Sequence, residues 1–117
     1  MTTARTRSGS DGLLRLLGLA RRAGCVASGV EATRRALRAG EASLVLVAGD
    51  ASAVQVKKIE GLLGARGVPG AVVADRDRLG RAVGGPPLSA VALTDRRFAE
   101  RLLRELPGGT SEVGQEA

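Results

Sequence analysis

The chain has 117 residues, 44% of them hydrophobic, which is enough for one domain with its own core. Its formal net charge is +6, and it contains no His, so the usual general base and triad base of enzymes are missing. Cys25 is the only cysteine, which excludes an intrachain disulfide or a cysteine-based zinc site.

The basic residues are almost all arginines, with Lys57 and Lys58 as the two lysines. Arginine pairs bidentately with phosphates and with guanine edges, so the basic excess favours a nucleic-acid partner. The codon bias of a GC-rich genome is the alternative explanation of the charge. No apolar run is long enough to span a membrane, and residues 1–10 lack the apolar segment of a secretory signal peptide. A single thiol suits the reducing environment of the cytosol. We therefore expect a cytoplasmic protein.

The N-terminal third predicts a tail, a helix and a short strand. Residues 1–10 are small and polar, which is typical of a disordered tail. Leucines at helical spacing from Leu13 predict a first helix, capped by Ser10 or Asp11 and ended by Gly24. Residues 25–27 predict a brief extended segment, in which Cys25 is expected to pack against the core.

A basic helix is predicted from about residue 29 to 39. Ser28 and Glu31 have the spacing of a capping box, and Gly40 stands where a C′ glycine is expected. One side of this helix carries Arg34, Arg35 and Arg38. A helix N-terminus beside guanidinium groups is a potential anion site.

The rest of the chain alternates apolar runs with helices. Three runs predict strands buried on both faces: 43–48, 71–74 and 89–93. Three helices are predicted: about 53–66 with Asp50 or Ser52 as cap, a short one from Asp75 or Asp77, and one from Thr94 or Asp95 to Leu106. Pro107 ends the last helix and residues 107–117 predict a disordered tail, so residues 11–106 form a single domain, a three-layer α/β sandwich.

Three aspartates directly follow predicted strands: Asp50, Asp75 and Asp95. In open α/β folds ligands bind at the carboxyl ends of strands, so these carboxylates are candidate nucleophiles or metal ligands. Helix capping explains all three more simply, and we predict no catalytic residue, cofactor or metal. Phe98 is the only aromatic residue, so a base-stacking platform is not expected.

The arginines concentrate between residues 11 and 40. Six lie there against two acids, and we expect several of them to converge near the start of the basic helix. A solvated helix face without a partner is the alternative.

Residues 16–50, 79–84 and 90–95, together with Val68 and Pro69, resemble the bacterial YlxQ-like branch of the ribosomal protein L-seven-Ae / L-thirty-e family. The resemblance covers nearly all of residues 12–106. It implies an α-β-α sandwich with about five helices around a four-stranded mixed sheet, residues 25–27 being the short extra strand. It also implies cytoplasmic, non-catalytic RNA binding.

Family members that bind kink-turns present a Gly-x-Asn-Glu-x-x-Lys motif at the start of the second helix. By this resemblance Gly29 matches the motif and Arg35 replaces its lysine, within reach of guanine O6 and N7. Glu31 stands in place of the asparagine, where the cap or Arg35 is expected to hold it, and Ala32 replaces the glutamate. These two departures predict a looser, salt-sensitive RNA binder rather than a strict kink-turn binder.

The predicted function is therefore binding of structured RNA, either ribosomal RNA or a kink-turn-like element, by a monomer. The ribosome and the translation or transcription machinery are candidate partners. A protein-interaction module that has lost RNA recognition is the alternative. The predicted RNA-binding residues are Ser28, Gly29, Glu31, Ala32, Arg34, Arg35, Arg38, Arg21, Arg22, Pro86, Pro87 and Leu88.

Overall fold

A computed structural model describes residues 2–106, which form five helices and four strands. In chain order these are α1 (Thr2–Arg22), β1 (Val26–Ser28), α2 (Val30–Arg38), β2 (Leu44–Ala48), α3 (Ala53–Arg66), β3 (Gly70–Val73), α4 (Arg76–Ala82), β4 (Ala90–Leu93) and α5 (Arg96–Glu105). Within this part of the chain, none of the helices combines the length and hydrophobicity that crossing a bilayer requires.

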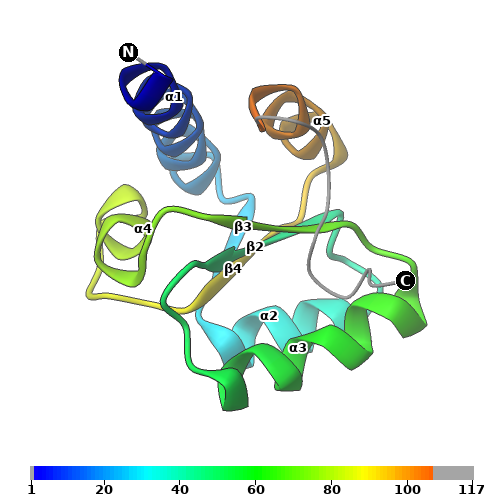
Figure 1. Cartoon of the computed structure of the whole chain (residues 1–117). Helices are drawn as coiled ribbons and strands as arrows, with labels where there is room; N and C mark the ends of the chain where they lie inside the picture. Colours follow the sequence, from blue (N-terminus) through cyan, green and yellow to red (C-terminus); the bar gives the residue numbers. More distant parts are fainter. Residues whose placement is uncertain (1, 107–117) are drawn as a thin grey trace.

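The four strands form one mixed sheet in the order β1-β4-β2-β3. β2 and β3 are parallel, whereas β4 runs antiparallel to both of its neighbours, β1 and β2. Helices α1, α4 and α5 cover one face of the sheet, and α2 and α3 cover the other (Figure 1). The predicted three-layer sandwich, with five helices around a four-stranded mixed sheet, is confirmed.

The sheet divides the core into two clusters. Along β2, Leu44, Leu46 and Ala48 pack toward α1, α4 and α5, while Val45 and Val47 pack toward α2 and α3. All five residues of β2 are buried, which is why this strand appears in the sequence as an unbroken apolar run. Cys25 is half-buried against the first cluster, as predicted.

The first helix differs from the prediction at its N-terminus. α1 begins at Thr2 rather than at Ser10 or Asp11, so the segment expected to be a disordered tail continues the helix. The segment contains no proline, and a helix already formed downstream extends at the gain of one hydrogen bond per residue. The prediction of a disordered tail over residues 107–117 lies outside the described residues.

Candidate nucleic-acid interface

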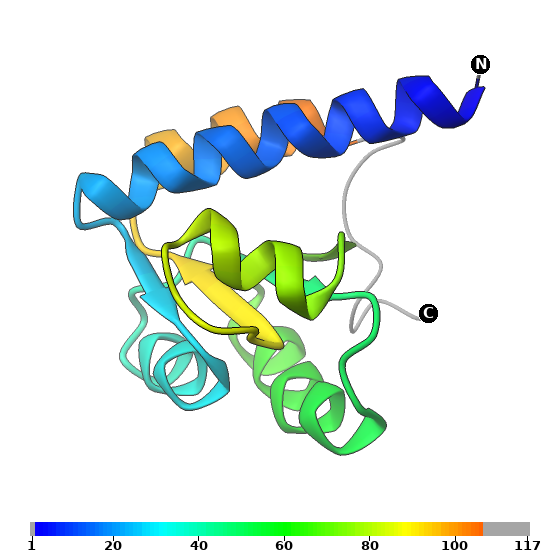
Figure 2. The same cartoon turned by 90° about the vertical axis from the view of Figure 1, so that its left-hand side faces the viewer.

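The chain segments that follow β1, β2 and β3, and the segment that precedes β4, lie at the same end of the sheet. Backbone hydrogen bonds join the neighbours: Gly29 donates to the Ala90 carbonyl (2.9 Å), Ala48 to Ser89 (2.8 Å) and Gly49 to Ala74 (3.0 Å). We call this the sheet-end face and define it as residues 28–35 with the loop 84–88. It faces the viewer in Figure 2.

The start of α2 lacks the capping box that the sequence predicts. Gly29, not Ser28, is the N-cap residue, and no side-chain hydrogen bond closes this terminus. Ser28 is the last residue of β1 and pairs with Val91, because strand pairing extends one residue further than the local pattern indicates. The first N–H groups of α2 are therefore available to an anion at the positive end of the helix dipole.

Glycine geometry explains why the chain can turn from β1 into α2 here. Gly29 has φ 99° and ψ 161°, a conformation essentially restricted to glycine. A Cβ at this position would meet no atom within 4 Å, so the requirement for glycine is conformational and the space beside it is open. That open space lies directly in front of the helix N-terminus.

Glu31 pairs with Arg34, not with Arg35 or a cap as expected. The Arg34 Nη1 to Glu31 Oε2 distance is 3.5 Å, with 29% and 65% of the two side chains exposed, so the pair contributes little stability. The pairing does offset the negative charge of the Glu31 carboxylate, which would otherwise repel an incoming phosphate. Ala32 is half-buried and brings no polar group.

The other two arginines of α2 are exposed and belong to no ion pair within residues 11–106. Arg35 begins the last turn, five residues and about 7.5 Å along the helix from Val30, and is the last-turn arginine nearer to the helix N-terminus. Arg38 is in the last turn, about 12 Å along the helix from Val30 at 1.5 Å per residue. Arg38 therefore contributes to the long-range field of the helix but not to a site at its N-terminus.

The loop 84–88 is held firmly against α4. Gly85 donates to the Gly80 carbonyl (2.9 Å), and Leu88 donates to the Arg76 carbonyl (3.1 Å). Pro86 and Pro87 are exposed, whereas Leu88 is half-buried against the core. The two prolines are thus the apolar contact surface that this loop offers.

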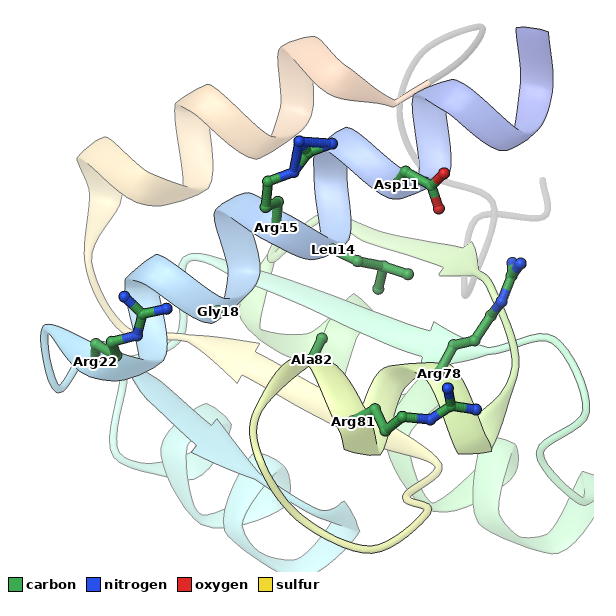
Figure 3. Close-up of a pocket in the computed structure, with 8 residues that line it drawn as sticks. All are labelled: Asp11, Leu14, Arg15, Gly18, Arg22, Arg78, Arg81 and Ala82. Carbon is green, nitrogen blue, oxygen red and sulfur yellow. The ribbon is translucent and has the colours of Figure 1, made fainter. Parts of the chain in front are cut away.

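Arg21 and Arg22 lie apart from α2, because α1 and α2 cover opposite faces of the sheet (Figure 1). The prediction that arginines of both helices converge near one N-terminus is wrong in this respect. Arg21 still reaches the loop: a Cβ added to Gly84 would stand 3.5 Å from its Nη1. Arg22 instead lines a cavity between α1 and α4 (Figure 3).

The three aspartates that follow strands have structural contacts. Asp75 accepts from Arg78 N (2.8 Å) as the cap of α4, and Asp95 caps α5. Asp50 does not cap α3, since Ser52 does so, but accepts from Arg76 N at the start of α4 (2.7 Å). Within residues 11–106 no three metal-ligating side chains form a cluster.

One guanidinium near this end has a perturbed pKa. Arg81 donates a hydrogen bond to Asp77 on the next turn of α4, and this bond, with the attraction between the two charges, raises the pKa of Arg81 above its ordinary value. Both side chains are exposed. A guanidinium is already protonated at neutral pH, so this shift leaves the charge of Arg81 there unchanged.

An uncapped helix N-terminus, an exposed arginine and an exposed proline loop thus lie at one end of an α-β-α sandwich. A model of the Ribosomal protein L7Ae/L30e/S12e/Gadd45 family matches residues 11–103, and the chain belongs to this family. It is 40% identical over 88 residues to the RNA-binding protein YlxQ of Bacillus subtilis, which covers 75% of this chain and 88% of that protein.

Two solved structures share the fold. A protein with unknown function from Bacillus halodurans C has a TM-score of 0.76 and 33% identity, over 80% of this chain and 94% of its own. The Giardia lamblia 15.5kD RNA binding protein has a TM-score of 0.71 and 20% identity, over 84% of each chain. Both cover the sandwich described above.

Proposed function

We propose that this protein binds structured RNA, without catalysis, through the sheet-end face. The observation that carries the proposal is the uncapped N-terminus of α2, with Arg35 exposed on the same helix and the loop of Pro86 and Pro87 at the same end of the sheet. The net charge of +6 and the 40% identity to a protein named for RNA binding support the same conclusion.

Each part of the face has a chemical role in this proposal. The free N–H groups of α2 bind a phosphate, and Arg35 donates to guanine O6 and N7, a contact worth about 1–3 kcal/mol of base discrimination. Pro86 and Pro87 pack on an unstacked nucleotide, and Arg21 neutralises the adjacent backbone. Ser28 is exposed at the end of β1, beside this site.

Two positions make recognition less strict. Glu31 accepts but does not donate, and it is already held by Arg34; Ala32 neither donates nor accepts. Fewer base-edge contacts leave a larger share of the affinity to phosphates, which makes binding salt-sensitive. We therefore propose ribosomal RNA or a kink-turn-like element as the target of a cytoplasmic monomer, rather than strict kink-turn recognition.

Binding of the purified protein to a panel of structured RNAs, measured against salt, tests the proposal. Substituting Arg34, Arg35 and Arg38 by Ala should weaken binding and flatten the slope of log K against log salt by about 0.7–0.9 for each phosphate that is no longer neutralised. Unchanged affinity and slope would show that this face is not the site.

A protein-interaction module is the second candidate, favoured by the same Glu31 and Ala32 and by the exposed prolines. A pull-down under nuclease separates the two functions. A protein partner retained after nuclease digestion would support the module, whereas recovery of ribosomal RNA alone would exclude it.

A further inference from the structure

A second basic surface lies between α1 and α4, on the sheet face opposite α2. The cavity there has a volume of about 420 Å³ and is bordered by Arg15 and Arg22 of α1 and by Arg78 and Arg81 of α4 (Figure 3). We call it the α1–α4 groove. The predicted RNA-binding residues include Arg22 but none of the other three.

The groove exists because the two helices touch at small residues. A Cβ added to Gly18 would stand 3.0 Å from the Ala82 carbonyl oxygen, so α4 approaches α1 closely only because residue 18 is glycine. Ala82 is half-buried at this crossing. Arginines of both helices border the cavity on either side of this contact (Figure 3).

The charge of the groove is largely uncompensated. Arg15, Arg22 and Arg78 belong to none of the ion pairs found within residues 11–106. Arg81 is paired with Asp77, and Asp11 is the one acid that lines the groove. Three arginines outside these ion pairs and one aspartate among the lining residues give the groove a positive charge, which favours an anionic ligand.

The geometry points to the phosphate backbone of RNA as that ligand: we infer that the α1–α4 groove is a second RNA-contact surface, taking the strand that leaves the sheet-end face. The inference rests on the proposed function. Guanidinium forks bind phosphates bidentately, and such contacts carry no sequence information. Arg15 and Arg22 are about 10 Å apart along α1, at 1.5 Å per residue, which suits successive phosphates better than a single ion.

The groove and the sheet-end face are physically continuous. α4 leads from Arg81 directly into the loop 84–88, and Arg21 lies against Gly84 at the start of that loop. Its neighbour Arg22 lines the groove. A strand that contacts Pro86 and Pro87 therefore meets guanidinium groups without interruption as it passes onto the α1–α4 groove.

The test compares two RNA hairpins with the same internal loop of tandem sheared G·A pairs, one with short stems and one with both stems lengthened by about one helical turn. The groove variant is Arg15→Gln/Arg22→Gln/Arg78→Gln. The control, Arg66→Gln/Arg97→Gln/Arg104→Gln, removes the same charge from exposed positions outside both surfaces. Thermal unfolding checks that both variants remain folded.

We expect the groove variant to lose affinity for the long hairpin, with a salt slope lower by about 2–3 because three phosphates are no longer neutralised, and to bind the short hairpin like the control. Hydroxyl-radical footprinting should show reduced protection in the added stems alone. A groove variant that matches the control on the long hairpin would overturn the inference, and so would an equal loss on both hairpins. A third variant, Arg34→Ala/Arg35→Ala/Arg38→Ala, tests the proposed function separately. If it keeps full affinity for both hairpins, that result counts against RNA binding at the sheet-end face and not against the groove.

Discussion

Gly80 of α4 packs directly against Pro86 of the loop that follows. A Cβ on Gly80 would overlap the Pro86 carbonyl and stand 2.9 Å from the Pro87 Cα. The two exposed prolines thus keep their position because residue 80 has no side chain. A buried glycine inside a helix here determines the shape of a candidate binding loop.

Replacing Gly80 by Ala should therefore displace the loop. We expect a loss of about 1–3 kcal/mol in the free energy of unfolding from overpacking, although alanine is the better helix former by about 1 kcal/mol. Urea unfolding measures the loss. Gly61→Ala in α3 is the matched control, since a Cβ there meets nothing within 4 Å, and it should stabilise the protein. Equal stabilisation by both substitutions would contradict the packing described.

Gly29→Ala tests the turn from β1 into α2. With φ 99° and ψ 161°, an alanine at this position is strained by about 1–3 kcal/mol even though the space around it is empty. We expect lower stability and weaker RNA binding together, because relief of the strain shifts the first N–H groups of α2. Gly64→Ala, in an open helical position, should leave RNA binding unchanged. An unstrained, fully active Gly29→Ala protein would show that the helix begins differently.

We expect the Asp50 carboxylate to stabilise the start of α4 by accepting the Arg76 N–H, a function that an asparagine amide can fulfil in part. Asp50→Ala leaves the Arg76 N–H without its acceptor and should cost about 0.5–2 kcal/mol, as for the loss of a helix cap. Asp50→Asn keeps an acceptor oxygen and should recover most of that loss. Thermal unfolding with and without Mg²⁺ completes the measurement. A metal-dependent rise in Tm that Asp50→Asn abolishes would instead support a metal site.

Thr33 carries a hydroxyl that the core does not satisfy. The residue is fully buried in α2, and Oγ1 has no hydrogen-bond partner among the described residues. Since an unpaired buried hydroxyl costs about 1–3 kcal/mol, Thr33→Val should be neutral or stabilising, while Thr33→Ala should destabilise because it removes a packed methyl group. Calorimetry on the two variants and the wild-type protein measures this; a Val variant clearly less stable than the wild-type protein would mean that the hydroxyl is bonded.

Features that depend on interactions between residues close in the sequence are predicted correctly, whereas features that depend on distant residues are not. Helices α3, α4 and α5 each begin at one of their two predicted caps, Ser52, Asp75 or Asp95, because a cap bonds to an N–H two or three residues away. β2 is predicted because burial on both faces leaves an unbroken apolar run. Ser28 is mispredicted because its pairing with Val91, far along the chain, outcompetes the local capping pattern.

The α1–α4 groove could not be predicted from the sequence for the same reason: its residues come together only through long-range packing. Gly29 and Arg35 are found through a contiguous motif, whereas Arg22 and Arg78 border the same cavity only because α1 packs on α4. One signal was present in the sequence: Gly18 interrupts the leucine-rich stripe of the first helix. A glycine inside such a stripe indicates a close helix contact, but only the fold shows which helix makes it.

The central claim, that RNA binds at the sheet-end face, is tested most directly by amide chemical shifts of isotope-labelled protein during titration with the hairpin that contains tandem sheared G·A pairs. We expect the largest changes at residues 30–32, at the free N–H groups of α2, and at Gly85 and Leu88 in the loop. Unchanged amides at the start of α2, with the largest changes in α3 or α5, would contradict it.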